Sequence, residues 1–250
     1  MSNHENWYQS FFNGIANRFW QKAIPEEYTT SEVEFIKRVT GLNPTSKIID
    51  VPCGYGRHSI ALAKEGHVIT AIDISDEYIE QLQQESKALR LNLQAKKADM
   101  LTYNFDPSMF DLAICLGNSF NYFSAANTKI FLNNIYNTLK PDGWFIIHSG
   151  ALAETILPSV GEKDWYLLDD IIYLGNRNYD VKESVLRSDY IFVENGKVEK
   201  KTAFHFVYTA AEVKRMLIDT GFTNVQIFSD ITGADYKLGA KQAYIFCKKQ

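Results

Sequence analysis

The sequence predicts an α/β fold with a doubly wound, mostly parallel sheet, and three patterns support this prediction. Residues 47–73 have the pattern of an apolar strand, a glycine turn, a helix and a second apolar strand. Apolar strand-like runs then alternate with helical periodicity up to about residue 148. From about 151 to 206 the apolar period changes to two, which indicates a small antiparallel insertion.

The first 44 residues predict a helical lid over the sheet. Apolar and aromatic side chains recur at positions 8, 11, 12, 15 and 19, a helical spacing with one apolar face. This segment is expected to be an aromatic-rich helix or a pair of helices. A second helix is expected over 31–40, with Thr30 and Ser31 as its N-terminal caps and Gly41 at its end.

The segment 47–73 is the most informative part of the chain. The apolar run that ends at Val51 has the composition of a buried parallel strand. Gly54 and Gly56 allow a sharp turn and the close approach of a ligand, because they carry no Cβ. The next strand ends at Asp73, 19 residues after Gly54, where a carboxylate can accept hydrogen bonds from a ribose hydroxyl pair. The sequence therefore predicts a site for a nucleotide-type ligand.

The alternation of strands and helices continues beyond Asp73. Ser75 is a candidate cap for the helix that follows, and Lys-Pro-Asp-Gly at 140–143 is expected to be a turn. The predicted elements are helix 76–89, strand 91–97, strand 110–116, helix 125–139 and strand 144–148.

The C-terminal hundred residues predict the antiparallel insertion and then a return to the core. Strand-like runs are expected at 166–168, 171–173, 183–193 and 198–206, and a hairpin turn at 194–196 joins the last two. Thr209 then caps a helix that ends at Gly221, and strands are expected at 225–228 and 242–247. We therefore expect a single domain, 1–250, made of a lid (1–44), a core (45–150 and 207–250) and an insertion (151–206).

Composition narrows the range of functions. The net charge of -4 argues against a nucleic-acid partner, because such proteins concentrate Lys and Arg on one face. The three cysteines are too far apart for a zinc knuckle or a CxxC pair, so no metal site is expected. The N-terminus lacks a secretory signal, and no window approaches the ~20 apolar residues of a membrane span. A cytoplasmic protein with no membrane partner is expected.

Taken together, these motifs resemble those of class I S-adenosylmethionine-dependent methyltransferases, and in particular a small-molecule-type subgroup. The resemblance implies a three-layer fold with a seven-stranded sheet whose last strand is antiparallel. It also implies S-adenosylmethionine as cofactor, S-adenosylhomocysteine as product and a small molecule as methyl acceptor. The matching segments are Asp50 to His58, Asp73, Ala98 to Met100, Phe110 to Phe120 and Leu139 to Gly143.

The resemblance implies a role for each cofactor-binding candidate. Asp50 would meet the methionine amino group, since a buried ammonium needs a counter-charge. Asp73 would bind the ribose hydroxyls, and Asp99 would accept from the adenine amino group. Pro52 stands where the family has its first glycine, so the turn must reach the cofactor from Cys53 onward. The remaining cofactor-binding candidates are Gly54, Gly56, Ile74, Met100, Leu116 and Asn118.

The methyl-accepting half of the reaction is less well defined by the sequence. A hydroxyl or protonated amine acceptor would need a base, for which His148, His205 and Tyr122 are the candidates. Substrate contacts are expected from Tyr8, Arg57 and His58, and Arg18, Arg177 and Arg187 are further candidates for a substrate carboxylate. An oxygen or nitrogen acceptor, and a monomer or homodimer, remain open.

Two other functions also remain open at this stage. An NAD(P)-dependent oxidoreductase also uses a glycine turn and an acid about 20 residues later, although the third glycine of its fingerprint is replaced here by Ser59. A protein of this fold that binds the cofactor without turnover is the second alternative. Amino-methyltransferases of nucleic acids would be expected to carry an Asp/Asn-Pro-Pro-aromatic motif, and this chain has Gly-Asn-Ser-Phe at 117–120 instead.

Overall fold

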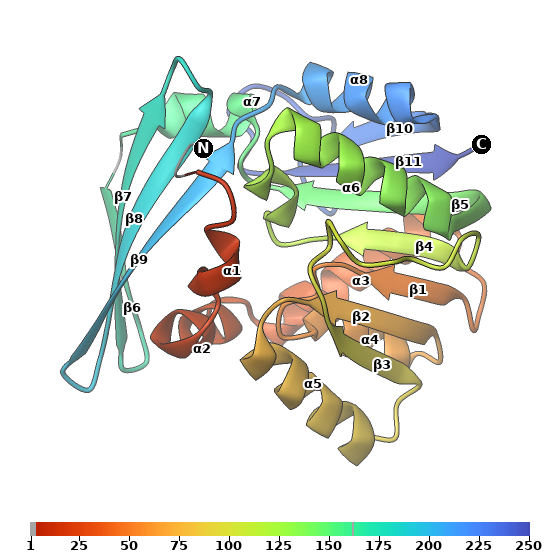
Figure 1. The fold of residues 1–250 in the computed structure, drawn as a ribbon, viewed down its shortest axis with the longest axis horizontal. Coiled ribbons are helices and arrows are strands. Elements are labelled where there is room, and N and C mark those ends of the chain that lie inside the picture. Colours follow the sequence, from red (N-terminus) through yellow and green to blue (C-terminus); the bar gives the residue numbers. More distant parts are fainter. Residues whose placement is uncertain (1–3, 162) are drawn as a thin grey trace.

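The computed structural model describes residues 4–161 and 163–250, and its main feature is a seven-stranded sheet (Figure 1). The strand order is β10-β11-β5-β4-β1-β2-β3, in which β11 runs antiparallel to both neighbours and the other pairs are parallel. The predicted sheet with an antiparallel last strand is therefore confirmed. Its strands are β1 (Lys47–Asp50), β2 (Val68–Asp73), β3 (Leu93–Lys97), β4 (Phe110–Cys115), β5 (Leu139–Ser149), β10 (Phe222–Phe228) and β11 (Ala243–Lys249).

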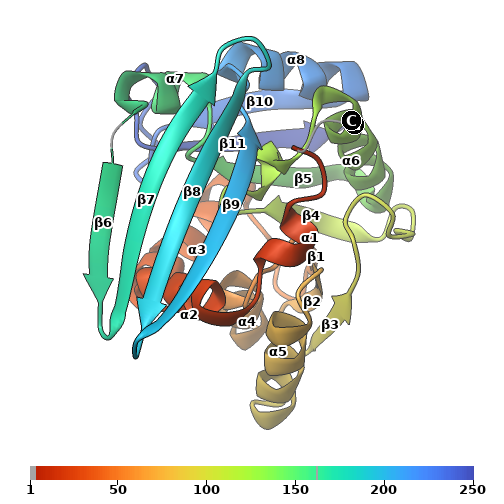
Figure 2. The same cartoon turned by 60° about the vertical axis from the view of Figure 1, so that its left-hand side comes forward.

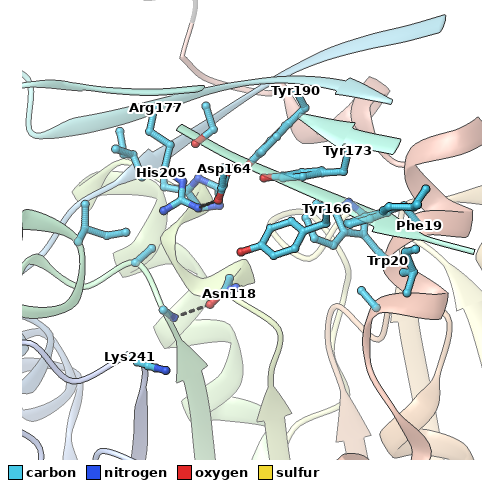
Figure 3. A pocket seen from close by; sticks show the side chains of 18 residues that line it. Phe19, Trp20, Asn118, Asp164, Tyr166, Tyr173, Arg177, Tyr190, His205 and Lys241 are labelled. Carbon is cyan, nitrogen blue, oxygen red and sulfur yellow. Dashed lines mark hydrogen bonds and ion pairs between the residues drawn. The ribbon is translucent and has the colours of Figure 1, made fainter. Parts of the chain in front are cut away.

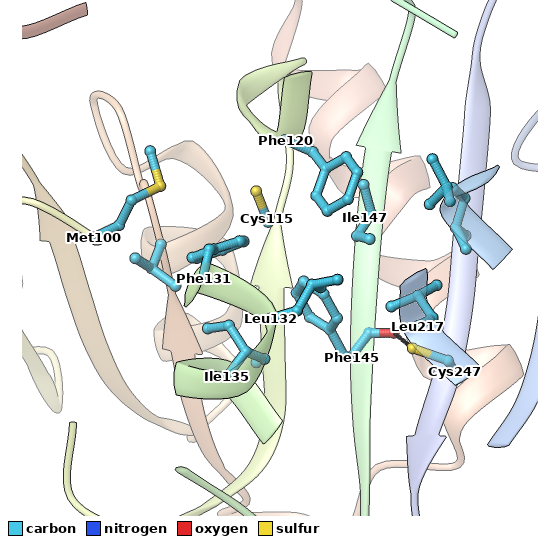
Figure 4. Packing of buried hydrophobic residues seen from close by; sticks show 14 of the residues in the cluster. Met100, Cys115, Phe120, Phe131, Leu132, Ile135, Phe145, Ile147, Leu217 and Cys247 are labelled. Atoms are coloured by element: carbon cyan, nitrogen blue, oxygen red, sulfur yellow. Dashed lines mark hydrogen bonds between the residues drawn. The ribbon is translucent and has the colours of Figure 1, made fainter. Parts of the chain in front are cut away.

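Helices cover both faces of this sheet, as the doubly wound prediction requires. One face is covered by α3 (Glu26–Thr40), α4 (Arg57–Lys64) and α5 (Asp76–Ala88). The other is covered by α6 (Ala125–Thr138) and α8 (Ala210–Thr220). Figure 4 shows the core between this second face and its helices, where Leu132 of α6 lies against Phe145 of β5 and Phe131 and Ile135 lie beside it. Burial of such large apolar side chains is the main force that holds the layers together.

Two local expectations are wrong. The second helix begins at Glu26 rather than near Ser31, because Pro25 and two acidic residues make a favourable first turn, and the Ser31 hydroxyl donates within the helix to the Glu27 carbonyl. The expected turn at 140–143 lies inside β5, which begins at Leu139. The pairing with β4 is irregular there, so the strand accommodates the extra residues as a bulge.

A second sheet of four strands follows the core, and its order β6-β7-β8-β9 is antiparallel throughout. The expected insertion of 151–206 opens with the short helical segments α7 (Ala153–Ile156) and η2 (Leu157–Ser159), so the sheet itself begins later than 151. Its strands are β6 (Lys163–Leu168), β7 (Ile171–Asp180), β8 (Val185–Glu194) and β9 (Lys197–Phe206).

The N-terminal segment forms two short helices, α1 (Tyr8–Phe11) and α2 (Gly14–Ala23), which lie between the two sheets (Figures 1 and 2). Ile15 and Phe19 of α2 pack on Ile171, Tyr173 and Phe192 of the second sheet. The parallel strands point toward this assembly, so their carboxyl ends face the lid and the second sheet. None of the helices in the described residues is long and apolar enough to cross a membrane.

Candidate functional site

A cavity of about 660 Å³ lies where the carboxyl ends of the parallel strands meet the lid. Open α/β sheets bind ligands at this edge. Apart from Gly56, Asp99 and the three arginine candidates, the predicted site residues line the cavity. The lining includes the predicted residues Tyr8, Asp50, Cys53, Gly54, Arg57, His58, Asp73, Ile74, Met100, Leu116, Asn118, Tyr122, His148 and His205.

Asp73 ties the glycine turn to the end of β2. Its Oδ2 accepts a hydrogen bond from the Gly54 N–H at 2.8 Å, and its Oδ1 accepts one from the Ser75 N–H at 2.9 Å. Burial raises the pKa of Asp73, while these backbone donors favour its ionised form. Gly54 has φ +55°, and a Cβ there would meet no atom within 4 Å. The turn is therefore held rigidly and leaves open space in front of Gly54.

Asp50, at the end of β1, is a nearly fully buried carboxylate on the cavity wall. It is 2% exposed, and its Oδ2 accepts a hydrogen bond of 2.7 Å from the Ser59 hydroxyl. Burial raises the pKa of Asp50 from 3.8 to about 7. No ion pair neutralises this carboxylate within the described residues. The group is therefore poised to accept a cation that enters the cavity.

Gly56 and Asp99 lie outside the cavity lining. Gly56 has φ +84°, and a Cβ there would lie 2.5 Å from the Leu82 Cδ1, so this glycine permits close packing of the turn against α5. Asp99 accepts from the Leu101 N–H at 2.9 Å and from the Tyr8 hydroxyl at 3.3 Å. Asp99 thus connects the end of β3 to the lid, and its contact with a ligand stays a prediction.

Glu32 organises Arg57 and His58 at the start of α4. It is fully buried, and it accepts hydrogen bonds from Arg57, from His58 at 3.0 Å and from the Tyr244 hydroxyl at 2.7 Å. Burial alone would raise the pKa of Glu32, but His58 and Arg57 hold it well below its usual range. Burial also lowers the pKa of His58 to about 4, so His58 is neutral at pH 7 and Arg57 supplies the counter-charge.

His148, at the end of β5, has both ring nitrogens engaged. The Gly117 N–H donates to its Nδ1 at 3.2 Å, and its Nε2 bonds the Gln242 Oε1 at 3.1 Å. This pattern makes Nε2 the protonated nitrogen. Burial lowers the pKa of His148, so the ring is neutral. His148 therefore fixes the backbone that follows β4 and has no free nitrogen for proton transfer.

The other two candidate bases are weak. Burial and the charge of Arg177 lower the pKa of His205 to about 4. Its Nδ1 is buried and lacks a hydrogen-bond partner among the described residues. Burial raises the pKa of Tyr122, whose ring lies against those of Trp7 and His205. At pH 7 His205 is therefore a weak base, and the Tyr122 phenol keeps its proton and cannot accept another from the acceptor.

A second cavity of about 520 Å³ adjoins the first beneath the four-stranded sheet (Figure 3). We call it the sheet chamber. Trp20, Asn118, Tyr190 and His205 line both cavities. Arg177 lies in the sheet chamber, paired with Asp164. The other two arginine candidates lie elsewhere, since they pair with Glu194 (Arg18) and Asp189 (Arg187) and have half-exposed or exposed side chains.

The comparison with known families decides between the functions that the sequence left open. The sequence profile described as "Methyltransferase domain" matches residues 48–143, which span β1 to the start of β5. The chain carries a methyltransferase domain. The fold agrees, because the solved structure of an S-adenosylmethionine-dependent methyltransferase from Clostridium acetobutylicum superposes with a TM-score of 0.80, at 16% identity, over 94% of this chain and 96% of that one.

Other relatives of the chain are also methyltransferases by name. A provisionally named methyltransferase of Geobacillus sp. (strain WCH70) is 23% identical over 97% of each chain. A glycine/sarcosine N-methyltransferase of Parasynechococcus marenigrum (strain WH8102) is 26% identical over 90% of this chain and 80% of its own. The matched domain and these relatives thus make the chain a methyltransferase, and the oxidoreductase alternative finds no support.

Several residues of the methyltransferase site had no signal in the sequence. Glu32 lies within an ordinary amphipathic helix, and Tyr244 and Gln242 lie in or beside a C-terminal strand more than 200 residues away. Asp164 is the second residue of the edge strand β6, near other acidic residues in the sequence. Only an alignment showing that these positions vary together could have indicated their contacts. Within the described residues no group of His, Cys, Asp and Glu is arranged to hold a metal ion.

Proposed function

We propose that the methyltransferase transfers the methyl group of S-adenosylmethionine to an amine nitrogen of a small molecule. The observation that carries the cofactor half is the pair of buried carboxylates, Asp50 and Asp73, at two neighbouring strand ends of one cavity. An isolated buried carboxylate is costly, so two of them on a cavity wall fit a ligand that brings a cation and hydroxyl donors. S-adenosylmethionine has both.

In this proposal each part of the cavity has its own task. Asp50 pairs with the cofactor ammonium, Asp73 accepts from the ribose hydroxyls, and Ile74 and Met100 pack against the adenine. Gly54 and Cys53 line the cavity, and the open space in front of Gly54 lets the ligand approach the backbone of the turn. When bound, the cofactor supplies a methyl group already activated by its sulfonium sulfur.

The weakness of the candidate bases supports an amine nitrogen as the methyl acceptor. His148 has no free nitrogen, His205 has its pKa lowered to about 4, and burial raises the pKa of Tyr122. A hydroxyl acceptor needs a positioned base, whereas a neutral amine attacks through its own lone pair. An amine nitrogen is therefore the acceptor that this site suits best. The glycine/sarcosine N-methyltransferases among the relatives act on amines by name, in agreement with this proposal.

The lid contributes positioning and the exclusion of water. Tyr8, Phe11 and Phe12 of the N-terminal segment line the cavity opposite the strand ends. Their rings form one aromatic cluster with Tyr122, which follows β4. Holding acceptor and methyl group in a dry, fixed geometry is the main source of rate for such a reaction. The whole chain would thus act as one catalytic unit; a cytoplasmic location stays a prediction of the sequence.

The test compares each amine with its matching alcohol. Glycine and glycolate, and glucosamine and glucose, are incubated with the enzyme and S-adenosylmethionine, and methylated products are identified by mass spectrometry. The proposal predicts that methylated product forms from an amine, with the added mass on nitrogen. Methylation of an alcohol at a rate equal to or above that of its amine would contradict it.

A further inference from the structure

We infer that the sheet chamber is the acceptor site, and that it takes an amine carried on a hydroxylated ring, such as an amino sugar. This inference rests on the proposed function, because the amine must reach the cofactor cavity. The two cavities share the wall formed by Trp20, Asn118, Tyr190 and His205. An acceptor in the sheet chamber can therefore place one group at this wall while the rest of the molecule stays beneath the four-stranded sheet.

The size of the sheet chamber argues against an amino acid as small as glycine. Its volume of about 520 Å³ lies within the range of roughly 300–1,000 Å³ that is usual for drug-sized ligands. Glycine would leave most of this space to water and would touch few of the lining side chains. The chamber fits an acceptor with at least one ring.

Aromatic side chains supply flat surfaces on which a ring can stack. Phe19 and Trp20 come from α2, and Tyr166 and Tyr173 come from the second sheet. The Phe19 and Tyr173 rings are buried and stack on each other at 4.9 Å with an interplanar angle of 10°, so they support the chamber wall, while Trp20 and Tyr166 keep exposed ring surface. Figure 3 shows the Tyr166 side chain directed toward the middle of the chamber. Aromatic faces of this kind contact the apolar faces of rings and fix their orientation.

Asp164 supplies the polar group that selects hydroxyl donors. Its Oδ2 pairs with Arg177, but its Oδ1 is buried and has no hydrogen-bond partner among the described residues. A buried acceptor left unpaired costs free energy, and a rotation of the carboxylate away from Gly175 would let a ligand hydroxyl remove that cost. Because Arg177 already compensates the charge of Asp164, the pair favours neutral donors over a second cation. The ligand hydroxyl groups would therefore lie at Asp164, and the amine would lie at the wall that the two cavities share.

The local sequence makes room for this carboxylate. Gly175 pairs with Asp164 across β6 and β7, and a Cβ at position 175 would lie 2.2 Å from the Asp164 Oδ1 and 2.7 Å from the Tyr173 hydroxyl. Any larger residue would displace the Asp164 carboxylate from its present position. Gly175→Ala is therefore a second way to disturb the Asp164 carboxylate, one that keeps every charge of the chamber.

The experiment is calorimetric titration of the enzyme loaded with S-adenosylhomocysteine. Three probes are compared: glucosamine, cyclohexylamine, which has a ring and an amine but no hydroxyls, and glycine. We expect glucosamine to bind at least about tenfold more tightly than either of the others. Asp164→Asn and Gly175→Ala should each remove this preference. Asp169→Asn, the same change at the exposed turn between β6 and β7, should retain it.

Two outcomes overturn the inference. Equal or tighter binding of glycine or cyclohexylamine would show that the chamber does not select a hydroxylated ring. A preference for glucosamine that survives both variants would show that Asp164 does not carry it. Thermal melts identify any variant that has unfolded, in which case the other variant decides. Failure of S-adenosylhomocysteine to bind would instead count against the proposed function, so the two failures are distinguishable.

Discussion

Asp73 and Gly54 are joined by a hydrogen bond of 2.8 Å from the Gly54 N–H to the Asp73 Oδ2. This bond connects the end of β2 to the turn after β1, so the acid and the glycine that mark the motif are in direct contact. The same carboxylate lies on the cavity wall. Asp73 therefore has two tasks in the proposed site, to hold the turn and to meet the ligand.

The two glycines of the turn are expected to differ in what they support. Gly56→Ala should lower the free energy of unfolding by at least about 2 kcal/mol, because it combines a positive φ with a collision of its Cβ with Leu82. Gly54→Ala should cost only the backbone strain of about 1 kcal/mol, but should weaken S-adenosylhomocysteine binding, since its Cβ enters open space by the ligand. Urea unfolding and calorimetry measure the two effects. Equal losses of stability would contradict this distinction.

Asp50 should make cofactor binding dependent on pH. Because its pKa is raised to about 7 by burial, the carboxyl is protonated in the free enzyme below that pH and must lose its proton to pair with the ligand ammonium. The affinity for S-adenosylhomocysteine should therefore rise with pH, by up to about tenfold per pH unit, and level off above about 7.

The free enzyme should show the opposite dependence in its stability. A raised pKa in the folded state means that the contribution of Asp50 to stability is present at acidic pH and is lost as pH rises through about 7. Asp50→Asn should remove the pH dependence of both the affinity and the stability. Because Asp73 is unchanged in this variant, any pH dependence that remains can be assigned to other groups such as Asp73. A pH profile of affinity that is the same in the wild type and in Asp50→Asn would contradict the assignment.

Breaking the buried cluster at Glu32 should be strongly destabilising. Glu32→Gln leaves the Arg57 guanidinium without its buried partner, and loss of one member of a buried ion pair costs about 3 kcal/mol or more. Glu34→Gln, in the same helix, removes only an exposed contact with Lys37 and should cost less than about 0.5 kcal/mol. Urea unfolding of both variants measures the difference. Similar losses in both would show that the cluster does not stabilise the fold.

The lid is held by acidic side chains that bind the first N–H groups of α2. Glu199 of β9 accepts from Ile15 and Ala16 at 3.1 and 3.2 Å, and Glu77 accepts from Gly14 at 3.1 Å. Glu199→Gln should weaken this capping by about 1 kcal/mol and so increase the population of open lid about fivefold. Limited trypsin digestion should then cleave faster within α2. An unchanged cleavage rate relative to a Glu183→Gln control, which alters an exposed loop, would contradict this role.

The sequence could predict the strand ends but not the contacts between distant elements. Asp50 and Asp73 were placed correctly at neighbouring strand ends because parallel strands with crossover helices bring their carboxyl ends to one edge. Gly54 and Gly56 look alike in the sequence, yet only the packing of Leu82 shows that Gly56 serves the fold. Glu32 and Tyr244 meet across 212 positions, and no local pattern indicates such a pair.

The central claim is that the S-adenosyl ligand lies in the larger cavity with its ribose at Asp73. Calorimetric titration of S-adenosylhomocysteine into wild type, Asp73→Ala and Asp76→Ala tests it most directly, because Asp76 is an exposed acid three residues further along that pairs only with Lys97 among the described residues. The account predicts that Asp73→Ala weakens binding by at least about tenfold while Asp76→Ala does not. Unchanged affinity in a folded Asp73→Ala enzyme would contradict it.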